Sequence, residues 1–185
     1  MKKIFNAIIY FLGLLFLAII ITLIAVFCLS HSTIGVTAQD RQFIAQAYAE
    51  VGLASTSNDY PVGAIITDNG KIIAQAHNTV QKEGDSRNHA EMVAINEALN
   101  KLGIGDFSQA TGTIVLYTTY EPCPMCEGYI VWKKVPRLIV GKRKGFVTLV
   151  KENFLSHLLY RFNERGGIDE SIHDQLDASY QHAQH

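Results

Sequence analysis

The stretch Pro122-Cys123-Pro124-Met125-Cys126 places two thiols three residues apart, at the start of an expected helix over residues 123–133. Residues with this spacing share one helix face, so Cys123 and Cys126 can hold a single metal ion. The positive end of a helix dipole also favours the thiolate form that binds metals. The stretch therefore predicts part of a metal site.

A second stretch, His89-Ala90-Glu91, opens another expected helix over residues 90–102. One imidazole and two thiolates give three ligands, which leave a tetrahedral zinc ion one open position, as in catalytic sites. Water in that position is acidified, and Glu91 is the natural carrier of its proton to a departing group. Because positions 89 and 91 do not share a regular helix face, the pocket has to wrap around the first helical turn.

Two less specific interpretations of the cysteine pair stay open. The pair could be redox-active, although that use needs a different fold context. It could also belong to a structural zinc site, which normally has four Cys or His ligands. The only other cysteine, Cys28, lies in an apolar run, and His77 is a less favoured fourth ligand.

The rest of the chain alternates between helical and strand patterns. The expected elements are a helix over 40–54, a hairpin over 61–74 that turns at Asp68-Asn69-Gly70, strands over 113–119 and 137–140, a helix over 149–162 and a weak last helix from Ile168. This order predicts an α/β fold, a three-layer α/β/α sandwich around a mixed central sheet.

The amino-terminal segment suggests a membrane anchor. Residues 4–29 are apolar except for Asn6, Gly13 and Thr22, which is long enough for a transmembrane helix. Lys2 and Lys3 precede the run, so the positive-inside tendency predicts a single-pass protein with an extracytoplasmic (periplasmic) catalytic domain. A signal peptide cleaved near residues 36–38 is the alternative, although the run is longer than a usual signal core.

Composition and charge exclude several classes of protein. The 185 residues carry a net charge of −1, which argues against a protein whose main task is non-specific nucleic-acid binding. A charged fraction of 18% with 48% apolar residues excludes a disordered chain, and three cysteines do not make a disulfide framework. We expect an anchor at 1–30, a linker at 31–38, one catalytic domain at 39–165 and a carboxy-terminal extension at 166–185.

Several stretches in residues 40–141 resemble the cytidine and deoxycytidylate deaminase superfamily, in its purine-acting branch of guanine deaminases and tRNA adenosine deaminases. The matching stretches are residues 61–65, the turn at 68–70, His77-Asn78, residues 85–91 and residues 120–126. The resemblance implies the sandwich fold, a homodimer and a Zn²⁺ cofactor. It also implies a role for each matched residue: His89, Cys123 and Cys126 as zinc ligands, Glu91 as the proton shuttle, and Asn78, Ala64 and Ala90 as substrate contacts. For Asn78, a turn residue at the end of a strand is the alternative.

The chain departs from both branches after its last expected strand. Residues 141–147 carry neither the acidic residue usual in guanine deaminases nor the Asp-x-Lys-Thr-Gly-like stretch usual in the tRNA branch. Six basic side chains gather nearby: Lys133, Lys134, Arg137, Lys142, Arg143 and Lys144. They form either a phosphate-binding strip or, as we favour, the solvated edge of a strand.

The leading hypothesis is a membrane-anchored zinc hydrolase that deaminates a free base or nucleoside, most readily a purine such as guanine, and releases ammonia. Nucleic acid is a less favoured partner, because the expected orientation puts tRNA across the membrane. The alternatives are tRNA adenosine-to-inosine deamination and a non-catalytic, zinc-stabilised binding module. The substrate, the oligomeric state and the role of the chain after residue 145 are not determined by the sequence.

Overall fold

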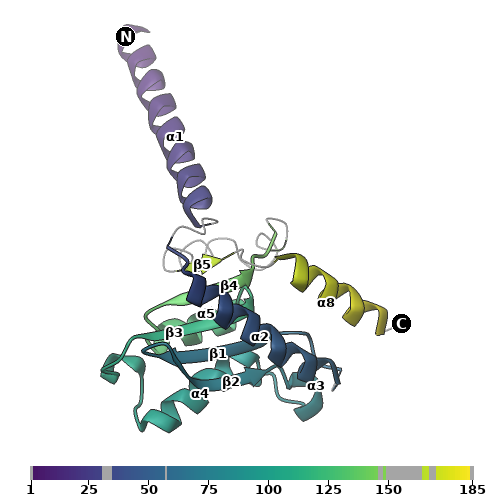
Figure 1. The fold of residues 1–185 in the computed structure, drawn as a ribbon. Coiled ribbons are helices and arrows are strands. Elements are labelled where there is room, and N and C mark those ends of the chain that lie inside the picture. The colour runs from purple at the N-terminus through teal and green to yellow at the C-terminus, as the bar shows by residue number, and fades with distance from the viewer. Residues whose placement is uncertain are drawn as a thin grey trace.

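A five-stranded mixed sheet forms the centre of the molecule (Figure 1). The computed structural model describes residues 2–30, 35–56, 58–145, 148, 164–166 and 170–183. The strands are β1 Gly63–Asp68, β2 Lys71–His77, β3 Ile114–Tyr120, β4 Leu138–Lys142 and β5 Glu164–Gly166, in the order β2-β1-β3-β4-β5. Strand β1 is antiparallel to β2 and β3, whereas β3, β4 and β5 are parallel, so the mixed sheet is confirmed.

The first two strands form the expected hairpin. Its two central turn residues, Asn69 and Gly70, have φ of 49° and 73°. Positive φ at both positions is what a type I′ turn requires, and this turn matches the right-handed twist of the strands.

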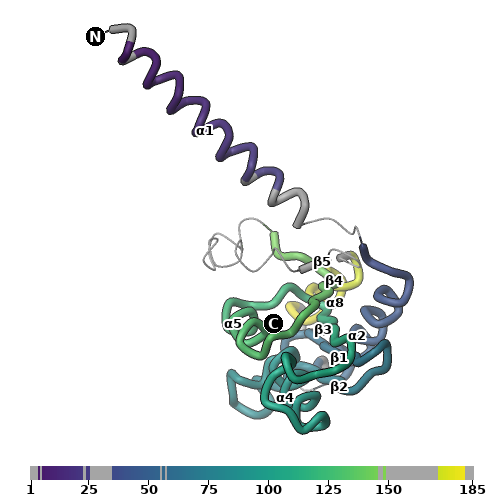
Figure 2. Tube along the Cα trace, turned by 90° about the vertical axis from the view of Figure 1, so that its left-hand side faces the viewer, coloured from purple at the N-terminus to yellow at the C-terminus, as the bar shows by residue number. Residues whose placement is uncertain are grey.

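Helices cover both faces of the sheet (Figure 2). Helix α2 (Ala38–Thr56) packs on one face around Ile44, Ile65 and Ile139. Helices α4 (Ala90–Leu102) and α5 (Pro124–Trp132) cover the other face, where Ile95 packs against Ile66 and its neighbours. Neighbouring residues of a strand point to opposite faces, so β1 supplies apolar side chains to both cores.

Short elements complete the domain. Helix α3 (Val80–Glu83) follows β2, and a 3₁₀ turn at Phe107–Gln109 follows α4. The last described helix is α8 (Glu170–Ala183), which the sequence predicts only as a weak helix. The expected helix over residues 149–162 lies outside the described residues.

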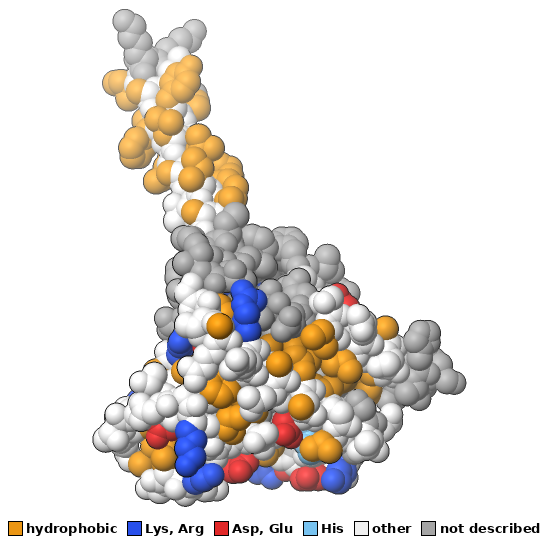
Figure 3. Space-filling view, in the orientation of Figure 1, with side chains coloured by type: hydrophobic (Ala, Val, Ile, Leu, Met, Phe, Trp, Pro, Cys, Tyr) orange, Lys and Arg blue, Asp and Glu red, His pale blue; other side chains and the backbone are white. Residues whose placement is uncertain are grey.

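The expected transmembrane anchor is wrong. Residues Lys2–Ser30 do form a helix, α1, which stands away from the sheet with exposed apolar side chains (Figures 1 and 3). Among the described residues, however, no helix combines the length and apolarity that crossing a membrane requires.

The expected location is wrong as well, because it depended on the membrane anchor. A single-pass topology, a membrane partner and an extracytoplasmic catalytic domain all rested on a span that the described part of the chain does not contain. The argument that the membrane separates the protein from tRNA has the same basis, and it falls too.

Candidate metal centre and substrate cavity

The starts of two helices meet on one side of the sheet. His89 is the N-cap residue of α4, and Cys123 is the N-cap residue of α5. Both have extended backbone conformations, with ψ of 143° and 164°, so their side chains leave the chain before the first helical turn. This explains how His89 and Glu91 reach one pocket, since only Glu91 belongs to the regular helix.

The three expected ligands come together at this junction. Nδ1 of His89 lies 3.4 Å from Sγ of Cys126 and 3.7 Å from Sγ of Cys123. All three ligand atoms lie within 4.8 Å of one another. A tetrahedral zinc ion with ordinary bond lengths separates a nitrogen and a sulfur ligand by about 3.6 Å. The donor set and its spacing therefore fit Zn²⁺.

His77 does not join this group. It ends β2, where its Nδ1 lies 3.8 Å from a carboxylate oxygen of Glu50. Among the described residues the metal-binding group consists of one histidine and two cysteines. Three ligands are typical of a catalytic zinc site rather than a closed structural one.

Electrostatics at the junction favour the metal-binding form of one ligand, Cys123, whereas the neighbouring Cys123 and burial raise the pKa of Cys126. Hydrogen bonds from Cys126 and His89 lower the pKa of Cys123 to about 3. The same contact with Cys123 raises the pKa of His89. Before metal binds, the site thus holds a thiolate beside a histidine, and metal binding displaces a proton.

Glu91 lies directly beside the three ligands and is 4% exposed. The Cys126 thiol lies 3.7 Å from one carboxyl oxygen, and the Thr118 hydroxyl lies 3.4 Å from the other. Burial raises the pKa of Glu91, because the charged form loses its hydration. A buried carboxyl with a raised pKa holds a proton more readily than an exposed one, which suits a group that accepts and returns a proton.

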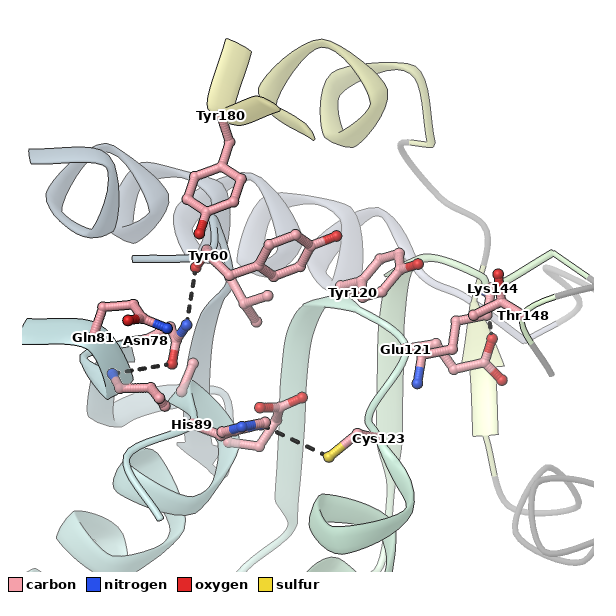
Figure 4. Close-up of a pocket in the computed structure, with 14 residues that line it drawn as sticks. Tyr60, Asn78, Gln81, His89, Tyr120, Glu121, Cys123, Lys144, Thr148 and Tyr180 are labelled. Carbon is pink, nitrogen blue, oxygen red and sulfur yellow. Dashed lines mark hydrogen bonds between the residues drawn. The ribbon is translucent and has the colours of Figure 1, made fainter. Parts of the chain in front are cut away.

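A cavity of about 460 Å³ opens beside this group (Figure 4). His89, Ala90, Glu91 and Cys123 form its zinc-side wall. The remaining lining residues are Tyr60, Val62, Asn78, Val80, Gln81, Tyr120, Glu121, Lys144, Thr148 and Tyr180. The volume is in the range of small-molecule sites and accommodates a purine ring.

Two of the three expected substrate contacts line the cavity, and the third does not. Asn78 and Ala90 line the cavity, whereas Ala64 is fully buried in β1 and is not among the lining residues. The amide nitrogen of Asn78 lies 3.3 Å from the Tyr60 carbonyl oxygen, and its oxygen accepts a hydrogen bond from the Val80 backbone N–H at 3.4 Å. These long bonds hold the amide at the cavity wall. They also agree with the turn role that was the alternative for Asn78.

Sequence reasoning missed the aromatic side of the cavity. Tyr60 precedes β1, Tyr120 ends β3, and Tyr180 comes from α8. The rings of Tyr60 and Tyr180 meet edge to face at 5.5 Å, and His173 stacks on Tyr120 at 4.4 Å. A weak helical pattern was the only signal from α8, and it gave no indication of where the helix docks.

The six basic residues form neither a phosphate strip nor a solvated edge. Arg143 and Lys144 are each 4% exposed, and strand β4 lies between β3 and β5 rather than at an edge. Lys134, Arg137 and Lys142 pair with Asp106, Asp40 and Asp174. Most of these charges are therefore engaged within the domain.

Known proteins are similar in sequence to the part of the chain that holds this site. A model of the cytidine and deoxycytidylate deaminase zinc-binding region matches residues 37–142. The tRNA-specific adenosine deaminase of Bacillus subtilis (strain 168) is 41% identical over 136 residues, which are 72% of this chain and 81% of that protein.

Solved structures of deaminases are also similar to this chain. A guanine deaminase from Nitrosomonas europaea superposes with a TM-score of 0.66 at 25% identity, over 76% of this chain and 83% of that one. A structure from work on A-to-I editing by tRNA:A34 deaminases has a TM-score of 0.51 at 31% identity, over 56% of this chain and 76% of that one. The chain belongs to the cytidine and deoxycytidylate deaminase family of zinc-dependent enzymes.

Proposed function

We propose that the enzyme converts adenosine to inosine in tRNA, by replacing the 6-amino group of the base with oxygen. The observation that carries this proposal is the 41% identity to a tRNA-specific adenosine deaminase across 81% of its length. The sequence alone favoured a free purine, partly because a membrane was expected between enzyme and tRNA. Without that span the ranking reverses. Family membership also argues against a non-catalytic zinc module.

We assign His89, Cys123 and Cys126 as the zinc ligands, and their fit to a tetrahedral ion supports this assignment. Zinc in this site would supply a water molecule whose pKa is lowered toward neutrality. The protein's own contribution is to leave one position open and to keep both thiols beside the imidazole.

Glu91 is assigned to proton transfer. Its carboxylate accepts a proton from the attacking water and delivers it to the ring nitrogen next to the reacting carbon. The remaining proton of that water, now on the hydroxyl group attached to the carbon, then passes to the amino group, which leaves as ammonia while the hydroxyl oxygen becomes the carbonyl oxygen. The position of Glu91 beside the ligands, its burial and its raised pKa support this role.

The cavity wall opposite the metal ligands, which includes Tyr60, Asn78 and Tyr120, is assigned to binding the base. An amide such as that of Asn78 presents a donor and an acceptor and suits the edge of a purine. Enzymes that modify bases in nucleic acids bring the target base out of its stack and into a pocket. The aromatic rings of Tyr60 and Tyr120 provide apolar surfaces for such a base.

A free purine base is the second candidate substrate. Two observations favour it: Tyr180 of α8 lies on the cavity wall, and the guanine deaminase structure superposes on more of the chain than the tRNA:A34 deaminase structure does. A helix placed there restricts the space around the base. A homodimer stays a prediction for either substrate, to be checked by light scattering.

An ammonia-release assay decides between these substrates. The full chain, loaded with zinc, is given a tRNA anticodon stem-loop with adenosine at the wobble position, its guanosine counterpart, and free guanine, adenine, cytosine and their nucleosides. We expect ammonia and inosine from the adenosine stem-loop alone. Release from free guanine but not from RNA would overturn the proposal in favour of the second candidate.

A further inference from the structure

A buried group of charges lies behind the metal ligand Cys123. Glu121 is 1% exposed, and Arg143 and Lys144 are each 4% exposed. Burying charges costs free energy unless they are paired and hydrogen-bonded. Glu121 lies two residues before the metal ligand Cys123, so this group calls for a reason beyond stability.

Four contacts join residues 121–122, which precede the ligand Cys123, to the end of β4 and the two residues that follow it. The Glu121 backbone N–H donates to the Lys142 carbonyl at 2.9 Å, and the Lys144 N–H donates to a Glu121 carboxylate oxygen at 2.6 Å. The Arg143 guanidinium lies 3.4 Å from the other oxygen. Finally, Nζ of Lys144 donates to the Pro122 carbonyl oxygen at 2.9 Å. This last bond reaches the peptide group that joins Pro122 to Cys123.

We propose that Lys144 is a positioning residue for the metal centre, holding the Pro122–Cys123 peptide so that the Cys123 thiolate points at the metal. The bond is made at the peptide where the chain passes from β3 into α5. Cys123 is the N-cap residue, and its carbonyl accepts the first helical hydrogen bond, from the Glu127 N–H at 2.9 Å. The Pro122–Cys123 peptide before it lies outside the regular helix and needs a separate constraint. A bond from Lys144 supplies that constraint from outside.

The charge of Lys144 adds to its hydrogen bond. Lys144 and the metal ligand Cys123 both line the cavity (Figure 4). A charged donor makes a stronger hydrogen bond to a carbonyl oxygen than a neutral donor does. The inference rests on the metal site and not on the identity of the base, so it can be tested without any substrate.

The test compares Lys144→Met with Lys142→Met in the full chain loaded with zinc. Lys142 lies two residues earlier and pairs with Asp174 at the surface, so its variant removes a lysine charge without touching Pro122. Zinc release to a chromogenic chelator is followed over time. We expect release about 10- to 100-fold faster from Lys144→Met than from Lys142→Met, the usual effect of losing a group that orients a ligand. Equal release rates would overturn the proposal.

A second measurement separates positioning from general stability. The two variants are loaded with Co²⁺, and their thiolate-to-metal absorption bands are recorded. A shifted or weakened band in Lys144→Met alone supports the proposal, whereas identical bands contradict it. If Lys144→Met does not fold, Lys144→Gln and Lys142→Gln replace the pair with the same expected results.

Discussion

The two walls of the cavity differ in how they are assembled. The zinc-side wall comes from two short motifs, residues 89–91 at the start of α4 and Cys123 at the start of α5. The opposite wall combines Tyr60, Asn78 and Tyr120 with Tyr180 of α8, which lies 60 positions after Tyr120. Chemistry is thus encoded in short local motifs, and substrate choice in long-range packing.

The largest expected effect is on the zinc-side wall. Cys123→Ala removes one of three ligands, and it should abolish detectable turnover and lower the melting temperature together, because metal binding contributes folding free energy. Zinc content by atomic absorption and thermal unfolding with and without a chelator check this prediction. A variant that keeps a full equivalent of zinc would contradict the ligand assignment.

The second prediction separates metal binding from proton transfer. Glu91→Gln keeps the shape of the side chain and removes its acid–base function, so kcat should fall by about 10²- to 10⁴-fold. Zinc content should stay at the wild-type level, because Glu91 is not among the three ligands. Ammonia release per zinc ion is the measurement, and unchanged turnover would refute the assigned role.

A smaller effect is expected on the opposite wall. Asn78→Ala removes the amide assigned to the base and should lower kcat/KM by about 10- to 100-fold, the range for a lost hydrogen bond to a buried polar group. Gln81→Ala, on the same wall, serves as the matched control and should change kcat/KM only a few-fold. Equal effects of the two variants would favour a turn role for Asn78.

The smallest effect concerns the attachment of α8. Burial lowers the pKa of His173 to about 4, and neither ring nitrogen has a hydrogen-bond partner among the described residues. Neutral His173 therefore stabilises the docked helix fully above about pH 6.5, and this contribution is lost as the pH falls from there toward 4. The predicted loss is about 2 kcal/mol at pH 5.

Hydrogen exchange of the α8 amides checks this prediction at pH 7 and pH 5, corrected for intrinsic exchange rates. His173→Phe keeps a ring to stack on Tyr120 but cannot be protonated, so its protection should not fall with pH. A wild-type helix that is equally protected at both values would contradict the prediction.

Local patterns predicted the zinc-side wall and much of the sheet. The turn at Asn69-Gly70 and the helix that starts after His89 follow from backbone preferences of individual residues, and the structure contains both. Contacts between distant segments were not predictable in this way. The stacking of His173 on Tyr120 and the burial of Lys144 depend on where α8 and the end of β4 dock. Hydropathy alone also misled, since an apolar run that forms a helix is not thereby a membrane span.

The central claim is that one imidazole and two thiolates hold a catalytic zinc ion with one position left open. X-ray absorption at the zinc edge of the loaded full chain tests it most directly. The account predicts two sulfur atoms at about 2.3 Å and two nitrogen or oxygen atoms at about 2.0–2.1 Å, one of them from His89. A coordination sphere without sulfur, or one made up entirely of protein ligands, would contradict it.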